Sequence, residues 1–343
     1  MPEVMRRAAL AIALAFSFAV VVGTAGAQPS APRSWAAPQI ATVVGQGLMA
    51  PTVGAFRPDD ALLWSEFATV LARLGVAVPV VDPDRSVTMR ELDAQLVGVV
   101  GLRPEARAIR LAARDAGLSP RSWLGTETVA RLLGLRINHL MDQEHLELQL
   151  AQPATRAEAA FSVARVLALT EGEIEYIRQT AGTFTTPSVT EWQRTVLTRA
   201  LRFVGSPYVF AGTSEKPQLV FGKSAPGGFD CSGFVWRVYK LQPFVGAPAL
   251  PAVLAGRSSY EMSGEVAPSY RITRNRLQAG DIVFFGTNGP RSKPSEVGHM
   301  GIYLGNGWIV HSSRTGTTLQ PMVDWYQTTF AWGRRPLAEA GLA

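Results

Sequence analysis

Cysteine is nearly absent from this sequence: Cys231 is the only one in 343 residues, and there are four histidines. A single cysteine cannot form an internal disulfide, so the fold has to be stabilised by its hydrophobic core. The histidines and the scattered carboxylates lack the close spacing of metal ligands. No phosphate-binding loop or dinucleotide fingerprint stands beside the strand and helix that it requires. We therefore expect neither a metal nor a cofactor.

Clusters of basic residues are also missing. The chain carries 33 lysines and arginines against 27 carboxylates, a formal net charge of +6, but the excess is spread along the sequence. That pattern does not indicate a nucleic-acid partner. A modest basic excess does suit contact with polyanionic cell-wall material.

Long hydrophobic runs are confined to the start of the chain. Arg6 and Arg7 precede an apolar stretch at 8–22, and small residues follow at 25–27. This is the pattern of a signal peptide over residues 1–27. The alternative is a retained membrane anchor, but the stretch is shorter than the roughly 20 residues that a membrane span needs. We expect a secreted protein, located at the cell surface or in the periplasm.

Stretches rich in proline and glycine divide the remaining sequence. Residues 28–60 contain five prolines and are expected to form a linker or an irregular segment. A second stretch of this kind, at 180–188, marks a junction. The length that remains suggests two domains, which we place at 61–180 and 189–338.

The first of these domains is predicted to be helical. Four segments, beginning at residues 63, 88, 124 and 155, open helices whose apolar residues recur every three or four positions. In two of them a threonine stands three residues before a glutamate, Thr88 with Glu91 and Thr155 with Glu158, which is a capping-box signature. Helices this short are marginal alone, so we expect an all-α bundle with an imperfect repeat.

The last helix opening, Gln-Pro-Ala-Thr-Arg-Ala-Glu-Ala-Ala at 152–160, resembles the motif of S-layer homology repeats. That resemblance implies anchoring to a secondary cell-wall polymer, as in bacterial surface proteins. The alternative is a generic helical bundle. His139 and His145 also fall in this domain, six residues apart and without a cysteine nearby, so we expect surface or helix-end residues rather than metal ligands.

The second domain contains the cysteine. Two glycines precede Phe-Asp-Cys-Ser-Gly-Phe-Val at 229–235, and the apolar residues after the cysteine share one helical face: Phe234, Val235, Val238 and Tyr239. Cys231 is therefore predicted at the first turn of a helix that Asp230 caps. A helix N-terminus favours a thiolate, whereas the Asp230 carboxylate opposes it, so a nearby cation is required and an imidazolium would serve. The alternative is a buried structural cysteine.

Two histidines follow the cysteine on predicted strands. Residues 280–285, 297–304 and 308–312 have strand patterns, and the last two are joined as a hairpin. The strand residues expected to be substantially buried are Ile282, Phe284, Ile302, Leu304 and Ile309. Trp325 and Trp332 are expected to close the far edge of the sheet.

The length of the hairpin loop decides where His299 and His311 point. A two-residue loop pairs Gly305 with Trp308 and puts the two imidazoles on opposite faces of the sheet. A three-residue loop pairs Gly301 with His311 instead. Both imidazoles then lie on one face, at roughly 7–8 Å between backbones. We predict the three-residue loop.

Cys231, His299 and His311 can then form a catalytic triad. Cys231 is the nucleophile, His299 is the general base and later the acid that protonates the leaving amine, and His311 orients His299. A lone histidine in a strand is usually structural, but two on one face opposite a lone cysteine favour catalysis.

Four ordered segments resemble the NlpC family of papain-like cysteine peptidases, which cut bacterial peptidoglycan stem peptides. They are Phe-Asp-Cys-Ser-Gly-Phe-Val at 229–235, Gly-Asp-Ile-Val-Phe-Phe at 280–285, Val-Gly-His-Met-Gly-Ile-Tyr at 297–303 and Ile-Val-His-Ser-Ser at 309–313. Two further segments are similar to the family, Pro-Tyr-Val-Phe-Ala-Gly at 207–212 and Arg-Ser-Ser-Tyr-Glu at 257–261. The resemblance covers residues 190–336 and implies an α+β fold, with the cysteine helix packed on an antiparallel sheet.

The resemblance also implies roles for residues around the cysteine. Tyr208 corresponds to a tyrosine near the oxyanion site. Asp230 and Ser232 match positions that bind the free amine of an N-terminal L-alanine on the stem peptide. In that case the enzyme cuts the bond between the γ-carboxyl of D-glutamate and a diamino acid.

Some positions depart from the family. Ala211 stands where the family usually has glycine, Ala279 replaces proline, and Met262 replaces glutamine. The stretch between Tyr208 and Cys231 is longer than typical, which indicates an altered rim of the cleft.

Two other functions remain open. An N-acetylmuramoyl-L-alanine amidase of related papain-like fold has the same order of cysteine, histidine and polar residue, and only its products separate it from the endopeptidase. A non-catalytic wall-binding surface protein would have lost a member of the triad, whereas all three candidates are present. The leading hypothesis is a secreted peptidoglycan endopeptidase with an N-terminal wall-binding domain.

Overall fold

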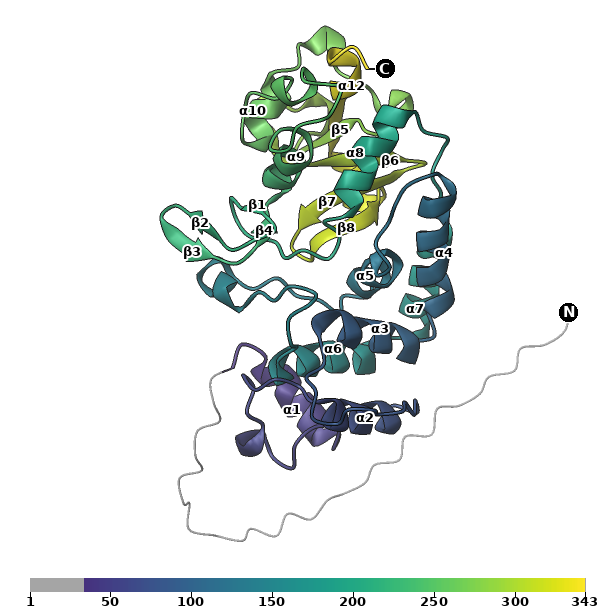
Figure 1. Cartoon of the computed structure of the whole chain (residues 1–343), viewed down its shortest axis with the longest axis vertical. Helices are drawn as coiled ribbons and strands as arrows, with labels where there is room; N and C mark the ends of the chain where they lie inside the picture. Colours follow the sequence, from purple (N-terminus) through teal and green to yellow (C-terminus); the bar gives the residue numbers. More distant parts are fainter. Residues whose placement is uncertain (1–33, 343) are drawn as a thin grey trace, which may run out of the picture. The chain divides into compact units, whose positions relative to one another are not determined.

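A computed structural model describes residues 34–342 (Figure 1). The predicted signal peptide and the first residues of the expected linker lie outside this range. Within it, no helix combines the length and the apolar character that crossing a membrane requires.

The first part of the described chain is helical, as predicted. Its elements are α1 (Ala37–Gly45), η1 (Val53–Ala55), α2 (Trp64–Arg73), α3 (Met89–Val99), α4 (Arg103–Asp115), α5 (Leu124–Leu132), η2 (Met141–Leu146), α6 (Arg156–Ala168) and α7 (Glu171–Gly182). Helix α1 corrects the expectation of an irregular segment at 28–60. Its proline stands in the first turn, where no backbone N–H is lost, and its buried Ile40 and Val43 face a helix partner, α6.

Three of the four predicted repeats meet in a closed ring of backbone hydrogen bonds. The N–H of Leu62 donates to the carbonyl of Ala154, that of Ala154 to Val87, and that of Val87 to Leu62, each at 2.8 Å. These residues lie just before α2, α3 and α6, so the ring relates the three helix openings by an approximate three-fold arrangement. Helix α5, the fourth predicted repeat, does not take part.

Only one of the two predicted capping boxes closes. The Glu91 carboxylate accepts from the backbone N–H and the hydroxyl of Thr88. Thr155 caps α6 by accepting from the N–H of Glu158, but the Glu158 carboxylate turns to Nε2 of His139, 3.0 Å away. His139 is therefore buried, with 5% exposure, and the expectation that it lies on the surface is wrong.

The second part is α+β, again as predicted. It contains α8 (Glu191–Leu201), β1 (Thr213–Ser214), β2 (Gln218–Val220), β3 (Lys223–Ala225), β4 (Gly228–Phe229), α9 (Cys231–Tyr239), α10 (Ser259–Gly264), β5 (Ile282–Gly286), β6 (Val297–Gly305), β7 (Trp308–Ser313), β8 (Gly316–Pro321), α11 (Asp324–Thr329), β9 (Phe330–Arg334) and α12 (Pro336–Glu339). Five strands form one antiparallel sheet in the order β8-β7-β6-β5-β9. Two small hairpin-like pairs, β1 with β4 and β2 with β3, stand apart from it.

Helix α9 covers one face of this sheet, where it contacts β6 and β7 (Figure 1). The five strand residues expected in the core are all fully buried. Trp332 on β9 is buried at 2% exposure, as expected. Trp325 belongs to helix α11, and its ring lies 5.9 Å from that of Phe285 on the inner strand β5, so it lies against the sheet without closing its edge as expected.

The hairpin between β6 and β7 has a shorter loop than predicted. Gly305 pairs with Trp308, so the loop is the two residues Asn306 and Gly307, both in the left-handed region at φ 49° and 82°. This is the backbone geometry of a tight two-residue hairpin turn. The prediction of a three-residue loop is therefore wrong.

A β-bulge restores the register that the loop alone would have lost. Pairing shifts by one residue between Tyr303 and Gly305, and Ile302 pairs with Val310 beyond the shift. Gly301 consequently faces His311, and its position is so close that an added Cβ would lie 2.9 Å from the His311 Cβ. The two histidines share a face, as predicted, but an extra residue within the strand brings this about.

Candidate active site

Cys231 is the first residue of α9, at the position that the sequence predicted. Asp230 is the N-cap, and its carboxylate accepts from the backbone N–H of Gly233. The backbone N–H groups of Ser232 and Met300 face the sulfur and lower the pKa of the thiol. Met300 directly follows His299 in β6, so these contacts place the sulfur beside the histidine strand. Cys231 is partly exposed.

The two histidines form a direct hydrogen bond. Nε2 of His299 lies 2.8 Å from Nδ1 of His311. His311 is fully buried, whereas His299 is partly exposed. Because Nε2 of His299 is engaged by His311, Nδ1 is the nitrogen left for proton exchange with a thiol. The structure thus joins the two predicted histidines directly and sets the sulfur of Cys231 against the residue that follows His299, while their action as a triad with Cys231 stays a prediction.

The pKa shifts of Cys231 and the two histidines differ from those expected for a thiolate beside an imidazolium. Burial raises the pKa of Cys231 to about 12, and the nearby Asp230 carboxylate adds to that shift. Burial lowers the pKa of His299 to about 4 and holds that of His311 well below its usual range. Both shifts favour the neutral thiol and the neutral imidazoles over an ion pair. The shift of His299 disfavours the imidazolium that was expected as the cation next to the thiol.

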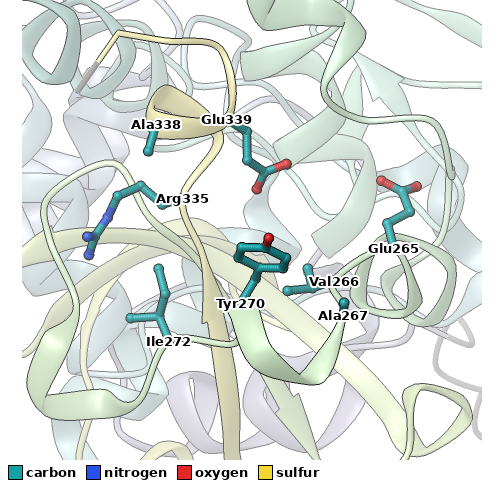
Figure 2. Close-up of a pocket in the computed structure, with 8 residues that line it drawn as sticks. All are labelled: Glu265, Val266, Ala267, Tyr270, Ile272, Arg335, Ala338 and Glu339. Atoms are coloured by element: carbon teal, nitrogen blue, oxygen red, sulfur yellow. The ribbon is translucent and has the colours of Figure 1, made fainter.

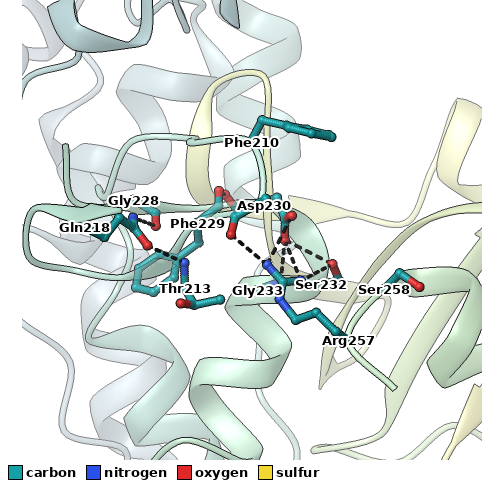
Figure 3. Close-up of polar contacts among 12 residues, drawn as sticks. Phe210, Thr213, Gln218, Gly228, Phe229, Asp230, Ser232, Gly233, Arg257 and Ser258 are labelled. Carbon is teal, nitrogen blue, oxygen red and sulfur yellow. Dashed lines mark hydrogen bonds and ion pairs between the residues drawn. The ribbon is translucent and has the colours of Figure 1, made fainter. Parts of the chain in front are cut away.

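Arg257 provides this cation instead (Figure 3). Its Nη1 lies 2.7 Å from the Ser232 hydroxyl and 3.3 Å from Oδ1 of Asp230, and its Nη2 lies 3.3 Å from Oδ2. Ser232 in turn donates to Asp230 at 3.0 Å. The two residues assigned to an alanine amine are therefore already bound to a guanidinium. Arg257 begins the segment 257–261 that resembles the NlpC family, but the sequence alone indicated no role for it.

Tyr208 lies close to the cysteine. Its backbone bridges to Phe229, and burial, followed by the charges of Cys231 and Asp230, raises the pKa of its phenol. This phenol remains a hydrogen-bond donor at all physiological pH values. Ala211, in the same segment, adopts φ 58°, a left-handed conformation that explains why glycine is expected there.

The long stretch before Cys231 carries two exposed phenylalanines. The β2–β3 hairpin carries Phe221, which is 80% exposed, and its ring lies 6.2 Å from that of Phe210. The backbone N–H of Phe210 donates to Glu144 of η2 at 2.7 Å. The helical part of the chain therefore reaches the edge of the candidate active site.

A pocket of about 480 Å³ elsewhere on the domain does not contain these residues (Figure 2). Its two carboxylates, Glu265 and Glu339, both accept from Arg334. Its Arg335 binds Asp281 at 2.8 Å. The charged side chains of this pocket thus neutralise one another or neighbouring residues. Over residues 34–342, no group of three or more histidine, cysteine or acidic side chains is placed to hold a metal ion.

Comparison with known proteins gives matches to the second part of the chain. Residues 205–335 match the NlpC/P60 family. Murein DD-endopeptidase MepH of Escherichia coli is 31% identical over 147 residues, which are 41% of this chain and 45% of that protein. Gamma-D-glutamyl-L-lysine dipeptidyl-peptidase of Bacillus cereus is 29% identical over 46% of this chain and 40% of its own length.

The chain therefore spans less than half the length of these curated relatives. Among solved structures, an NlpC/P60 family protein from Bacillus cereus is 25% identical, with a TM-score of 0.32 over 45% of this chain and 43% of that one.

Proposed function

We propose that this chain, whose residues 205–335 are an NlpC/P60 domain, hydrolyses peptide bonds in peptidoglycan by a thiol mechanism. The observation that carries the proposal is the 2.8 Å bond between His299 and His311, next to a cysteine at a helix N-terminus. The names of the relatives, a murein endopeptidase and a dipeptidyl-peptidase, support this substrate class.

The neutral site dictates the order of proton transfers. Nδ1 of His299 takes the thiol proton as the sulfur of Cys231 attacks the carbonyl carbon, and the resulting imidazolium gives that proton to the leaving amine. The C–N bond breaks and a thioester to Cys231 remains. Water then attacks the thioester with His299 again acting as base, which releases the acid and the thiol. His311 holds the ring of His299 in orientation, and we assign to the protonated Tyr208 phenol a hydrogen bond to the developing oxyanion.

The bond that we favour joins the γ-carboxyl of D-glutamate to the diamino acid. In this case Asp230 and Ser232 bind the free amine of an L-alanine. The pairing of Asp230 with Arg257 weakens the negative charge available for that amine. This observation favours a second candidate, cleavage of a cross-link between stem peptides, which requires no free alanine amine. The name of the Escherichia coli relative, a DD-endopeptidase, agrees with the second candidate.

Defined muropeptides distinguish these activities. Purified protein and its Cys231→Ala variant are incubated with an uncross-linked stem peptide bearing a free L-alanine, with a cross-linked dimer, and with a sugar-linked stem. Mass spectrometry of the products is the readout. Release of L-Ala-γ-D-Glu supports the first candidate, monomers from the dimer support the second, and a free intact stem peptide identifies an amidase. Intact substrates with both proteins would contradict the proposal and favour a non-catalytic wall-binding protein.

The helical part is proposed to bind a secondary cell-wall polymer after the protein is exported. The resemblance of 152–160 to S-layer homology motifs supports this, and so does the ring of three helix openings. Full-length Cys231→Ala protein should sediment with purified cell walls. It should fail to do so once the secondary polymer has been stripped from them, and equal sedimentation with both preparations would contradict a polymer-specific site.

A further inference from the structure

The inner histidine of the pair has a ring nitrogen without a hydrogen-bond partner. His311 is fully buried, and its Nδ1 is the atom that bonds to Nε2 of His299, 2.8 Å away. Its other ring nitrogen, Nε2, has no hydrogen-bond partner among residues 34–342. A buried polar atom without a partner is uncommon in a folded protein, so the surroundings of this nitrogen bear on how the histidine pair works.

The proposed mechanism determines which nitrogen of His311 carries the proton. Nδ1 of His299 takes the thiol proton, so it must start without one, and the proton of that ring is then on Nε2. This N–H donates to Nδ1 of His311, which has to be the acceptor. A neutral imidazole carries one proton on its two nitrogens. The proton of His311 is therefore on Nε2, the nitrogen without a partner.

The opposite tautomer of His311 would block the transfer. With its proton on Nδ1, His311 would donate to Nε2 of His299, and the His299 proton would then be on Nδ1, where the thiol proton has to arrive. Protonation of His299 would also make two N–H groups face each other. Burial nevertheless opposes the productive tautomer, because a buried N–H without an acceptor is disfavoured. A working site needs a group that stabilises the Nε2–H of His311.

The ring of Tyr326 is the group nearest to this requirement. Its centroid lies 5.2 Å from that of His311, with the two planes at 86°, so the edge of one ring meets the face of the other. One edge of the His311 ring is bound to His299, and the other edge carries Nε2. The face of an aromatic ring is partially negative and accepts N–H groups. Thr318, which pairs with His311 on β8, turns its hydroxyl to the Leu319 carbonyl instead, at 3.2 Å.

Neighbouring rings hold Tyr326 in place. The ring of Trp325 lies 5.1 Å from it at 88°, and that of Phe285 on β5 lies 5.3 Å from it at 78°. Both are edge-to-face contacts between rings. The backbone N–H of Tyr326 also donates to the Val323 carbonyl at 3.0 Å. The side-chain contacts act on the ring, so phenylalanine at position 326 would keep them.

We propose that Tyr326 is a positioning residue: the face of its ring accepts the Nε2–H of His311 and thereby selects the tautomer in which His299 can act as the base. Nothing in the sequence alone indicated a role for Tyr326. The inference rests on the proposed function, because it explains how the histidine pair is prepared for proton transfer. It adds a fourth side chain, carried by α11, to the three of the proposed triad.

Nuclear magnetic resonance of the histidine rings tests the tautomer without turnover. Full-length reduced protein is labelled with ¹⁵N in its histidines, and long-range proton–nitrogen correlations at neutral pH show which ring nitrogens carry protons. We expect His311 to be protonated on Nε2 and unprotonated on Nδ1, both in the wild type and in Tyr326→Phe. In Tyr326→Leu the proton should move to Nδ1. A proton on Nδ1 in the wild type, or an unchanged pattern in folded Tyr326→Leu, overturns the proposal.

Kinetics with a muropeptide substrate show whether the tautomer matters for catalysis. Tyr326→Leu should lower kcat roughly tenfold with little change in KM, the size expected when a buried N–H loses its acceptor. Tyr326→Phe should keep the wild-type rate, and so should the control Tyr270→Leu, which removes a ring that is 76% exposed. Equal losses in Tyr326→Phe and Tyr326→Leu would show that the hydroxyl and not the ring face is responsible, which contradicts the proposal.

The two readouts separate this inference from the proposed function. If the proton position on His311 depends on Tyr326 but the wild type hydrolyses no muropeptide, the positioning role stands and the proposed peptidase is wrong. If the wild type hydrolyses muropeptides while His311 carries its proton on Nδ1, the positioning role is wrong and the peptidase stands.

Discussion

Arg257 lies 2.7 Å from the hydroxyl of Ser232 and also contacts both carboxylate oxygens of its neighbour Asp230. The two contacted residues flank the nucleophile on either side. A carboxylate this close to Cys231 raises the pKa of the thiol, and the guanidinium partly offsets this effect. Removing the Arg257 charge should therefore raise the pKa of the Cys231 thiol and change its reactivity.

Arg257→Gln should slow the alkylation of Cys231. Loss of the cation leaves the Asp230 charge uncompensated, so the pKa of the thiol rises and less thiolate is present at a given pH. A rise of half a unit to one unit corresponds to a rate roughly three to ten times slower. The measurement is the second-order rate of reaction with iodoacetamide at pH 8. Arg257→Lys keeps the charge and should retain most of the rate; equal losses in both variants would show that the charge is not responsible.

The rate of peptide hydrolysis should depend on pH through His299. The imidazole acts as a base only when neutral, and burial lowers its pKa to about 4. The value of kcat/KM should therefore be level through the neutral range and fall as the pH drops toward 4. Initial rates at low substrate concentration give the profile, with tryptophan fluorescence as the control for unfolding. A break near pH 6 to 7 would instead indicate a solvated imidazole.

Local sequence patterns predicted the helix and the strands that carry the site residues. They did not predict the contacts that set the positions and the pKa values of these residues. The cap at Asp230 and the strands follow from turn residues and alternation, whereas the shared face of the histidines results from a bulge and not from the predicted three-residue loop. The bulge at 303–305 does not follow from local sequence, because Tyr303 is also held by the two residues just before β5: its N–H donates to the Asp281 carbonyl and its carbonyl accepts from the Gly280 N–H, both at 2.8 Å. Such pairing exists only once the sheet has formed.

Hydrogen bonds between side chains far apart in the sequence could not be predicted for the same reason. The Thr155–Glu158 pattern indicates a capping box, yet the carboxylate binds His139, 19 residues earlier in the chain. Arg257 binds a residue 27 positions before it. No periodicity or spacing in the sequence identifies either partner.

Two glycines of β6 provide a matched test of the histidine geometry. A methyl group at Gly301 would lie 2.9 Å from the His311 Cβ and 3.0 Å from the Val310 carbonyl, whereas one at Gly298 would meet nothing within 4 Å. Gly301→Ala should displace His311 and lower kcat by roughly 10- to 100-fold, the range expected for a shift of about 1 Å in a catalytic group. Gly298→Ala should leave kcat nearly unchanged. Similar kcat values for the two variants, with both folded by circular dichroism, would contradict the proposed role of His311.

The helical part contains a buried carboxyl group that should make the protein less stable as the pH rises from about 4 to about 8. Asp93 of α3 is fully buried, and neither of its carboxylate oxygens has a hydrogen-bond partner among residues 34–342. Its one ion pair, with Nε of Arg136, is long at 3.8 Å. Burial raises the pKa of Asp93 to about 8; the charge of Arg136 opposes this shift, while those of Glu127 and Glu158 add to it.

The sign of the effect follows from proton binding. Between about pH 4 and pH 8 the folded protein keeps a proton on Asp93 that the unfolded chain releases, so the free energy of unfolding falls as the pH rises through this range. Asp93→Asn cannot ionise and should have a Tm a few degrees above wild type at pH 8, with little difference at pH 4.5. Thermal melts followed by circular dichroism at both pH values test this. A lower Tm for Asp93→Asn at pH 8 would show that Asp93 is ionised and serves as the partner of the Arg136 guanidinium.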